Sequence, residues 1–312
     1  MRTVRILFLG ASKRVSLLER FTEAAARHSI DLKLYSCEFD EKYCPISTLA
    51  TVIAGPKFLS NEFAEWLHDA VKNHSINIVI PTMDSATVAL SRFAELEVET
   101  CWHLVSSRSL CESMYDKKLA DDFFRQHGIP IPPNTPAHYP KILKPRLGFG
   151  AKNIHIVDNA AQYKEQYRND SEYVVQDFIS ECEEATVDIY HSPQYGILGY
   201  AVRDRIEVSD GEVMVCRARL PRENERLLIE QVANIDGWQG CITLQYLTDA
   251  QGNLYVVEIN PRFGGGVTCA MEAGLDMATY ILLEYFGKPL SPPKALRNII
   301  MSRARRDFFY EY

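Results

Sequence analysis

Three polar side chains alternate along residues 256–266, which read VVEINPRFGGG and follow a strand-like apolar run. In an extended strand, side chains at i, i+2 and i+4 share one face, so Glu258, Asn260 and Arg262 would point to one spot. A carboxylate and an amide oxygen suit Mg²⁺, and an arginine can form paired hydrogen bonds to a phosphate. This pattern predicts a nucleoside triphosphate site. The alternative is a strand end at which the Asn-Pro pair and the glycines only build a turn.

A lysine and a glycine-containing loop precede this segment in the chain. Lys144 ends a predicted strand, and Gly148 and Gly150 follow it closely. Backbone N–H groups in such loops can surround an anion, and the lysine adds a point charge for phosphate. The P-loop pattern GxxxxGK[ST] is absent from the sequence. The loop is therefore a candidate phosphate site, although a plain hairpin turn would explain it equally well.

Three further segments could complete a nucleotide site. Residues 176–179 end an apolar strand and could present backbone N–H and C=O groups to an adenine edge. Glu184 lies a few residues beyond and could accept hydrogen bonds from ribose hydroxyls. Gln245 lies on the predicted strand before Glu258, and a hairpin that turns at residues 249–252 would place the two side by side. Each of these residues alone could also be an ordinary exposed polar group.

The first hundred residues alternate strand and helix signals. We predict strands at residues 4–9, 32–36 and 76–80 and helices at residues 14–27 and 61–74. This alternation is typical of an α/β fold with a parallel sheet covered by helices on both faces. Ligands bind such folds at the carboxyl ends of the strands, where residues 10–14 and 81–85 form loops. The first loop lacks the GxGxxG fingerprint, which disfavours a hydride-transfer enzyme.

Four side chains of those loops could contact a polar substrate, namely Ser12, Lys13, Arg14 and Asp84. Ser12 and Asp84 could equally cap helices.

The chain changes character after these loops. A predicted helix at residues 116–127 ends at Gly128, and prolines stiffen residues 129–133 as an extended connection. Residues 141–178 predict a small α+β unit. Strand signals then dominate residues 184–260, which predicts an antiparallel sheet with helices near residues 223–236 and 267–285. Arg217 and Arg219 on this sheet could bind a substrate carboxylate or face solvent.

The composition is that of an ordinary globular protein, with 312 residues, 46% of them apolar, 24% charged and a net charge of −7. No apolar run of membrane-spanning length and no signal peptide pattern occurs, so we expect a cytoplasmic protein without a membrane partner. The negative charge argues against a nucleic-acid partner, and we expect the basic residues 303–306 to lie on a solvated helix face. Eight scattered cysteines without zinc-site spacing predict buried thiols.

Taken together and in this order, the motifs resemble the ATP-grasp superfamily. The resemblance rests on Lys117 after Asp116, on Lys144 with its glycine loop, and on QDFI, EATVD, Gln245 and EINPR at residues 176–179, 184–188, 245 and 258–262. It covers residues 108–290. The Gln, Glu and Asn metal set is most similar to the halves of the carbamoyl-phosphate synthase large subunit and to the pyrrolysine-pathway ligase.

The resemblance implies three structural units. Residues 1–107 would form a pre-ATP-grasp, Rossmann-like domain, residues 108–180 a small lid subdomain, and residues 181–312 a large subdomain with an antiparallel sheet. It also implies small-molecule substrates and allows for a homodimer.

The resemblance further implies roles for individual residues. Lys117 and Lys144 would hold ATP phosphates beside Gly148 and Gly150; Gln176, Asp177, Phe178 and Ile179 would bind adenine and Glu184 the ribose. Gln245, Glu258 and Asn260 would hold one or two Mg²⁺ ions, for which Mn²⁺ could substitute. Arg262 and Lys144 would be catalytic. The sequence departs from the family at Cys182, where a glycine is common, at Ala185, where an aromatic residue is common, and at Gln245, where an acidic residue often bridges two metals.

The implied activity is that of an ADP-forming ligase that joins a carboxylate to an amine. A carboxylate does not react with an amine directly because its leaving group is oxide, and phosphorylation to an acyl-phosphate removes this obstacle. A carboxyphosphate or carbamate kinase is an alternative, as is a nucleotide-binding module without turnover. Side-chain identity alone does not reveal which carboxylate and amine would be used.

Overall fold

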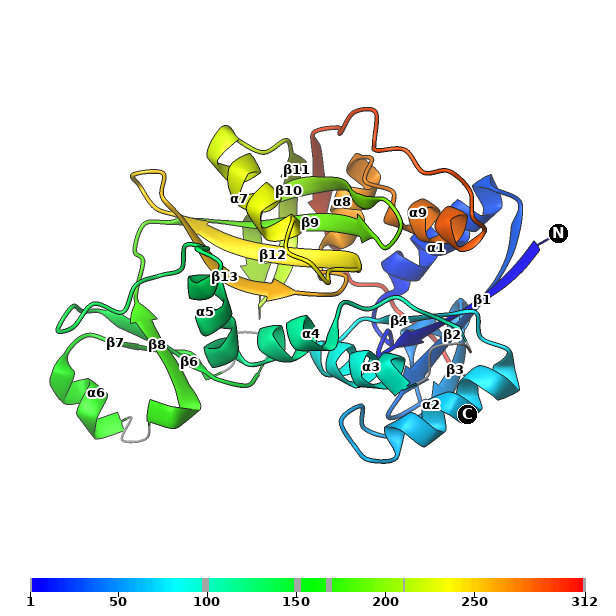
Figure 1. Cartoon of the computed structure of the whole chain (residues 1–312), viewed down its shortest axis with the longest axis horizontal. Coiled ribbons are helices and arrows are strands. Elements are labelled where there is room, and N and C mark those ends of the chain that lie inside the picture. The colour runs from blue at the N-terminus through cyan, green and yellow to red at the C-terminus, as the bar shows by residue number, and fades with distance from the viewer. Residues whose placement is uncertain (1, 97–100, 149–152, 167–169, 210, 311–312) are drawn as a thin grey trace.

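A parallel sheet forms the first unit of the chain (Figure 1). The computed structural model describes residues 2–96, 101–148, 153–166, 170–209 and 211–310. The five strands lie in the order β3-β2-β1-β4-β5. They are β1 (Arg2–Leu9), β2 (Ile30–Glu38), β3 (Thr51–Ala54), β4 (Ile78–Pro81) and β5 (Trp102–His103). The helices between them are α1 (Val15–Arg27), α2 (Phe63–His74) and α3 (Asp84–Leu96), and a 3-10 turn η1 spans Pro45–Thr48.

The side chains of β1 explain why this sheet is covered on both faces. Ile6 and Phe8 pack with α1 in one core, whereas Leu7 and Leu9 pack with α2 and α3 in another. Successive residues of a strand point to opposite faces, so a continuous apolar run demands two apolar layers. The predicted parallel sheet with helices on both faces is confirmed.

A six-stranded antiparallel sheet forms the largest unit. Its order is β13-β12-β9-β10-β11-β14, and every neighbouring pair is antiparallel. The strands are β9 (Glu183–Ser192), β10 (Gly196–Ser209), β11 (Glu212–Arg219), β12 (Gly240–Thr248), β13 (Leu254–Asn260) and β14 (Ile299–Ser302). The helices of this unit are α7 (Glu223–Ala233), α8 (Val267–Ala273) and α9 (Met277–Tyr285).

A three-stranded sheet projects from the rest of the molecule, at the lower left of Figure 1. Its order is β7-β6-β8, and helix α6 packs against β7. These elements are β6 (Lys141–Pro145), β7 (His155–Val157), α6 (Ala160–Gln166), the 3-10 turn η2 (Asp170–Glu172) and β8 (Tyr173–Asp177). Helices α4 (Arg108–Tyr115) and α5 (Lys117–Gln126) precede this sheet, and their buried residues Leu110, Met114 and Phe124 pack in the core under the six-stranded sheet.

The first unit and the six-stranded sheet share one apolar core. Phe21 of α1 makes edge-to-face contacts with Phe8 of β1 and with Phe263, at centroid distances of 5.1 and 6.1 Å. The same core includes Ala270 and Met271 of α8. Burial of these large aromatic side chains fixes the parallel sheet against the antiparallel one.

Two sequence predictions need correction. The expected helix at residues 267–285 is interrupted at Gly274, whose φ of +122° ends α8 before α9 begins. Residues 303–306 are not on a helix face but in a segment without regular secondary structure that follows the edge strand β14. The strands β9 to β13 and the hairpin at residues 249–252 are confirmed, with a hydrogen bond from the N–H of Gly252 to the carbonyl of Asp249.

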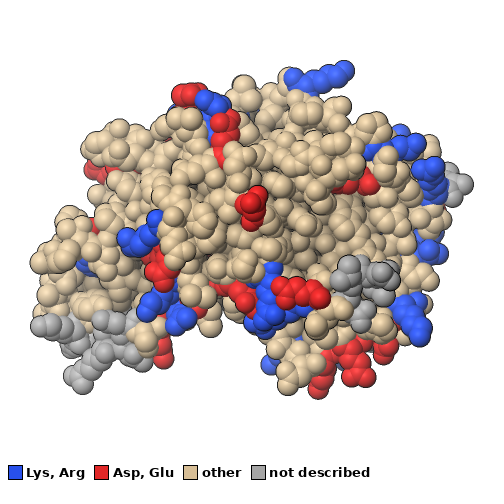
Figure 2. All heavy atoms as spheres, in the orientation of Figure 1, with Lys and Arg blue, Asp and Glu red and all other residues tan. Residues whose placement is uncertain are grey.

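The surface carries charges of both signs. Figure 2 shows acidic and basic side chains interspersed over one face of the molecule. Within the described parts of the chain, no helix is long and apolar enough to cross a membrane.

Candidate functional site

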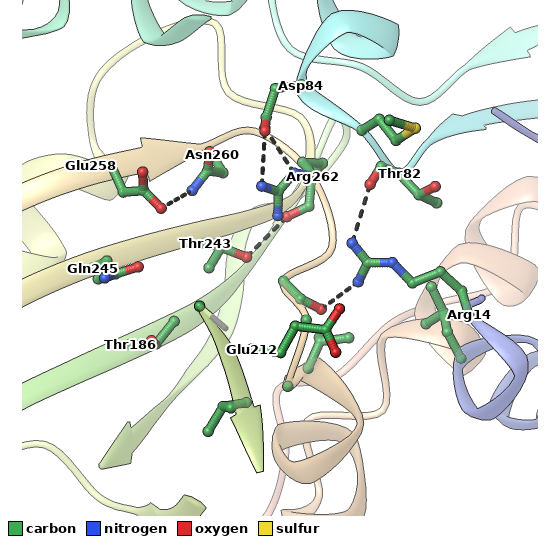
Figure 3. Close-up of a pocket in the computed structure, with 18 of the residues that line it drawn as sticks. Arg14, Thr82, Asp84, Thr186, Glu212, Thr243, Gln245, Glu258, Asn260 and Arg262 are labelled. Carbon is green, nitrogen blue, oxygen red and sulfur yellow. Dashed lines mark hydrogen bonds and ion pairs between the residues drawn. The ribbon is translucent and has the colours of Figure 1, made fainter. Parts of the chain in front are cut away.

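A cavity of about 820 Å³ lies where the parallel sheet, the six-stranded sheet and the helix α5 meet. Its wall includes residues from the loop after β1, the start of α3, the strands β12 and β13, the glycine turn at residues 264–266 and the segment at residues 303–308 that follows β14. In Figure 3, Asn260 points toward Glu258, and Arg262 points toward Asp84.

The three proposed metal ligands lie side by side on this wall. Gln245 of β12 is directly opposite Glu258 of β13 in the antiparallel register, as the hairpin predicted. Asn260 follows two residues later, and its Nδ2 donates a hydrogen bond to Glu258 Oε1 at 2.9 Å. Gln245 Nε2 donates to the carboxylate of Glu184 on β9. Both amide oxygens are thereby turned away from these internal partners.

Arg262 lines the same cavity and is held by a carboxylate from the first unit. Its Nε and Nη2 donate to the two oxygens of Asp84 at 2.8 and 3.0 Å (Figure 3). Burial opposes the charge of Arg262, but the carboxylates of Asp84 and Glu258 outweigh it and raise the pKa of the guanidinium. Arg262 is therefore a fixed cation beside the proposed metal ligands.

Lys117, the first residue of α5, also lines the cavity. Its Nζ donates to the carbonyl of Gly148 at 2.9 Å, and both residues line the cavity. Asp116 caps α5 by accepting from the N–H of Lys118, and it also forms an ion pair of 2.6 Å with Arg146. Gly150, which the sequence assigned to the same loop, lies outside the described residues.

Lys144 is buried next to the cavity and does not line it. Its Nζ donates to Gln176 Oε1 at 2.9 Å, and Gln176 Nε2 donates in turn to both oxygens of Asp121 at 3.1 Å. Burial lowers the pKa of Lys144, and the carboxylates of Asp121 and Glu258 oppose this shift. The carboxylate of Glu258 is thus close enough to oppose the lowering of the pKa of Lys144, although Lys144 is not among the described residues that line the cavity.

The proposed adenine segment is anchored mainly through its own side chains and N–H groups. The carboxylate of Asp177 forms a buried ion pair of 2.6 Å with Lys141. The N–H groups of Asp177 and Phe178 donate to the carbonyls of Pro133 and Pro140. Among the described residues no acceptor lies opposite the N–H of Ile179. Glu184, on the next segment, forms an ion pair of 3.1 Å with Arg205 and does not line the cavity.

A buried ion pair under the glycine turn was not predicted. Arg203 Nε donates to Asp188 Oδ2 at 2.5 Å, and the side chains are 2% and 0% exposed. A Cβ atom added to Gly266 would lie 2.3 Å from Arg203 Nη1, so this position has room only for glycine. The guanidinium plane of Arg203 therefore supports the turn that follows Arg262.

The sequence also missed partners that no local pattern marks. Asp121 lies on the face of α5 that carries Lys117, and this four-residue spacing was the one available signal. Arg217 and Arg219 do not line the cavity: Arg217 pairs with Asp204 at 2.7 Å, and Arg219 pairs with Asp204 at 2.8 Å and Glu225 at 2.7 Å.

The cysteines form no disulfide. All eight are free, and six of them are buried. In the parts of the chain that the structure describes, no group of three or more His, Cys, Asp or Glu side chains could hold a metal ion. A metal site at Glu258 would therefore combine this carboxylate with amide oxygens.

Comparison with known proteins agrees with this architecture. Residues 114–266 match the family model of the ATP-grasp domain. Pyruvate carboxylase 1 of Caenorhabditis elegans is 24% identical over 200 residues, which cover 59% of this chain and 16% of that protein. The chain thus aligns with about a sixth of the length of this relative.

Solved structures share the fold over almost the whole chain. N5-carboxyaminoimidazole synthetase from Staphylococcus aureus, complexed with ADP, has a TM-score of 0.78 at 16% identity and covers 97% of this chain and 83% of its own. The biotin carboxylase domain of Hydrogenobacter thermophilus 2-oxoglutarate carboxylase, a dimer in complex with MgADP and bicarbonate, has a TM-score of 0.75 at 16% identity, with coverages of 96% and 74%.

The fold and the matched domain together define the class of protein. A parallel-sheet unit precedes a small three-stranded sheet and a large antiparallel sheet, and the cavity lies between them. Residues 114–266 of the chain match an ATP-grasp domain, and nearly the whole chain shares the fold of the two solved structures.

Proposed function

We propose that this protein is an ADP-forming ligase that uses ATP and Mg²⁺ to join a carboxylate to an amine. The observation that carries the proposal is the convergence of Gln245, Glu258, Asn260 and Arg262 on one cavity wall, with Lys117 at the same cavity. A strand register that aligns one carboxylate, two amides and a guanidinium is the arrangement that a phosphoryl-transfer site needs.

The donor atoms fit a hard cation. Glu258 offers a carboxylate, and the amide groups of Gln245 and Asn260 use their N–H groups on Glu184 and Glu258, which leaves their oxygens for a metal. Mg²⁺ binds through few protein oxygens and completes its shell with phosphates and water. When bound, it would neutralise charge on the transferred phosphoryl group.

Phosphate binding is assigned to two lysines. Lys117 borders the cavity and would contact the phosphates directly. Lys144 donates a hydrogen bond to Gln176 and lies close to Asp121 and Glu258. Its positive charge would therefore attract the phosphates without direct contact. Their charges would compensate a tetra-anionic nucleotide in a cavity of low dielectric constant.

Adenine and ribose are assigned to the segment that leaves β8. The N–H of Ile179 is a backbone donor for the base, Phe178 would contact the ring, and Glu184 would accept the ribose hydroxyls. Because Glu184 is paired with Arg205 and Gln245, ribose binding would have to share or displace one of these contacts.

The reaction would proceed in two displacements. A carboxylate oxygen attacks the γ-phosphorus of ATP, so that an acyl-phosphate forms and ADP leaves; the amine then attacks the acyl carbon and expels phosphate as its proton is released. Arg262, oriented by Asp84, would stabilise the negative charge on the phosphoryl oxygens. The small sheet β7-β6-β8 could shield the acyl-phosphate from water by closing.

The test is ADP release from Mg²⁺-ATP with pooled carboxylates and amines, including bicarbonate, scored by mass spectrometry. ADP that depends on both substrates, together with a condensed mass, would establish the ligase. ADP that depends on bicarbonate alone would identify a carboxyphosphate kinase. ATP binding without turnover for any pool would contradict the ligase assignment. A homodimer stays a prediction, which analytical ultracentrifugation would check.

A further inference from the structure

Two arginines from opposite ends of the chain meet on the glycine turn that lines the cavity. Arg14 Nη1 donates to the carbonyl of Gly264 at 2.8 Å (Figure 3), and Arg303 Nη2 donates to the carbonyl of Gly265. Arg14 follows the first strand of the parallel sheet, whereas Arg303 follows β14. Both side chains line the cavity beyond Arg262.

The two guanidinium groups differ from the other arginines of the cavity because their charge is poorly compensated. Arg203, Arg205 and Arg262 each have a carboxylate within 3.1 Å. Among the described residues, no carboxylate lies within ion-pair distance of Arg14, whose second hydrogen bond goes to the carbonyl of Thr82 at 3.2 Å. Arg303 has one at 3.6 Å, namely Glu212.

Glu212 is a weak partner for Arg303. Its side chain is 73% exposed, so solvent screens the attraction between them. Burial and the neighbouring charge of Arg262 lower the pKa of Arg14 to about 10, because nearby cations and the loss of solvent both disfavour its charge. This part of the cavity therefore holds excess positive charge.

The segment that carries Arg303 is fixed at several points. The N–H of Arg303 donates to the carbonyl of Met214 at 2.8 Å. Arg306 pairs with Glu19 of α1 at 3.1 Å and lies over the ring of Phe308, which also lines the cavity. Tyr310 makes an edge-to-face contact with Tyr43 of the first unit. These contacts hold the segment between the two large units, so Arg303 reaches the cavity from a defined backbone position.

We propose that Arg14 and Arg303 bind an anionic group of the substrate, a carboxylate or a phosphate, other than the carboxylate that receives the phosphoryl group. Guanidinium groups present planar, paired donors that match both kinds of oxyanion. The proposal rests on the proposed function, since it names the substrate class of the same cavity: a substrate with a second acidic group. Glu212, beside the two arginines, would repel such a group.

The experiment is calorimetric titration of the full chain, without ATP, with succinate and with inorganic phosphate as probes. Arg303→Gln should weaken binding of the preferred probe about tenfold or more, as expected for a lost charge-assisted hydrogen bond. Arg305→Gln is the matched control, because it removes the same charge two residues away on a side chain outside the cavity lining. Glu212→Gln should strengthen binding, a change of opposite sign that a merely structural role would not produce.

The two probes separate the two sources of the anion. Tighter Arg303-dependent binding of succinate indicates a carboxylate, and tighter binding of phosphate indicates a phosphoryl group. Lack of binding for either probe, or equal effects of Arg303→Gln and Arg305→Gln, would overturn the proposal. So would binding that is weakened by Lys117→Gln and not by Arg303→Gln, since the probe would then occupy the nucleotide phosphate site.

Failure of the proposed function would be seen separately. A protein that binds the probes through Arg303 but releases no ADP with any substrate pool would keep the anion site and lose the ligase assignment. Where the ligase is active, Arg303→Gln should raise the KM of the acidic substrate and leave the KM of ATP unchanged.

Discussion

Asp84 and Arg262 are joined by two hydrogen bonds of 2.8 and 3.0 Å across the boundary between the parallel sheet and the six-stranded sheet. Asp84 is the first residue of α3, and Arg262 lies two residues beyond the end of β13, 178 positions later in the chain. The first unit therefore determines how an arginine of the ATP-grasp domain is oriented. This contact connects the stability of the unit boundary with the geometry of the cavity.

Asp84→Asn should lower ADP release about tenfold, because a neutral partner no longer fixes the charged guanidinium. It should also lower the free energy of unfolding by about 1–3 kcal/mol, the usual cost of losing a hydrogen bond to a charged group. Urea denaturation and the ADP assay measure the two effects. Glu112→Gln, which breaks an exposed pair with Arg92 and Arg108, is the control and should cost less than about 1 kcal/mol. Equal costs would contradict the structural role of Asp84.

Glu258→Gln should abolish turnover and leave the fold intact, because it removes the charge of a metal ligand without changing volume. A loss of about 10²-fold or more is expected for such an electrostatic contact. Turnover is followed by ADP release, and Mn²⁺ affinity by electron paramagnetic resonance. Glu207→Gln changes the same charge on an exposed position of the same sheet and should match the wild type. Wild-type activity in Glu258→Gln would refute the metal assignment.

Lys117→Gln should raise the KM of ATP about 10- to 100-fold, since one charge-assisted contact with a phosphate is worth about 1.5–3 kcal/mol. Lys118→Gln is a close control: it removes the same charge from the next residue, which does not line this cavity. Initial rates at varied ATP concentration measure the effect. If both variants raise the KM equally, Lys117 acts only through the overall charge of the surface.

Gly266→Ala should destabilise the protein by about 1–3 kcal/mol, the range for an added methyl group without space. The new Cβ would lie 2.3 Å from Arg203 Nη1 and 2.8 Å from Val213 Cγ1. Arg203 cannot move away without breaking its hydrogen bond to Asp188. Gly265→Ala has no atom within 4 Å of its Cβ and should change stability by less than about 0.5 kcal/mol. Chemical denaturation measures the free energy of unfolding of both variants. Similar losses of stability would mean that these positions require glycine for its backbone conformation and not for lack of space.

Ionisation of Glu225 should make the free energy of unfolding depend on pH in the acidic range. Burial raises its pKa, but Arg219, the N–H of Arg222 and the Tyr246 hydroxyl outweigh this and lower it from 4.5 to about 2. The lowered pKa means that the ionised group stabilises the fold fully above pH 4.5 and loses this contribution as the pH falls toward about 2. The stability difference between the wild type and Glu225→Gln, measured by denaturation from pH 7 to pH 2.5, should shrink over that range. A constant difference would contradict the assignment.

Much of the fold could be predicted because its signals are local. Strand signals in residues 184–260 predicted the strands β9 to β13, and the turn residues 249–252 predicted the hairpin that brings Gln245 opposite Glu258. The break at Gly274 was missed, because apolar residues on both sides continue a helical pattern across it. The strand β14 pairs with β11, which lies far away in the sequence, and no local pattern predicts such a pairing.

The site likewise has residues whose positions follow from local sequence and residues whose positions depend on tertiary packing. Glu258, Asn260 and Arg262 share a face because a strand has a fixed period of two, and sequence alone predicts that. The direction of Lys144 could not be predicted, because it depends on Gln176 and Asp121 of other elements. The contacts of Arg14 and Arg303 with the glycine turn depend on how the two large units pack, and their sequence separation leaves no pattern to read.

The aromatic core that joins α1 to residue 263 has a consequence for how the chain unfolds. Because Phe21 packs against Phe8 on one side and Phe263 on the other, removal of the first unit would expose the underside of α8 and leave Phe263 without its neighbour. Neither portion would then keep a complete interior. The parallel sheet and the antiparallel sheet should therefore melt together in one calorimetric transition, and dividing the gene between them should yield insoluble halves rather than two working modules.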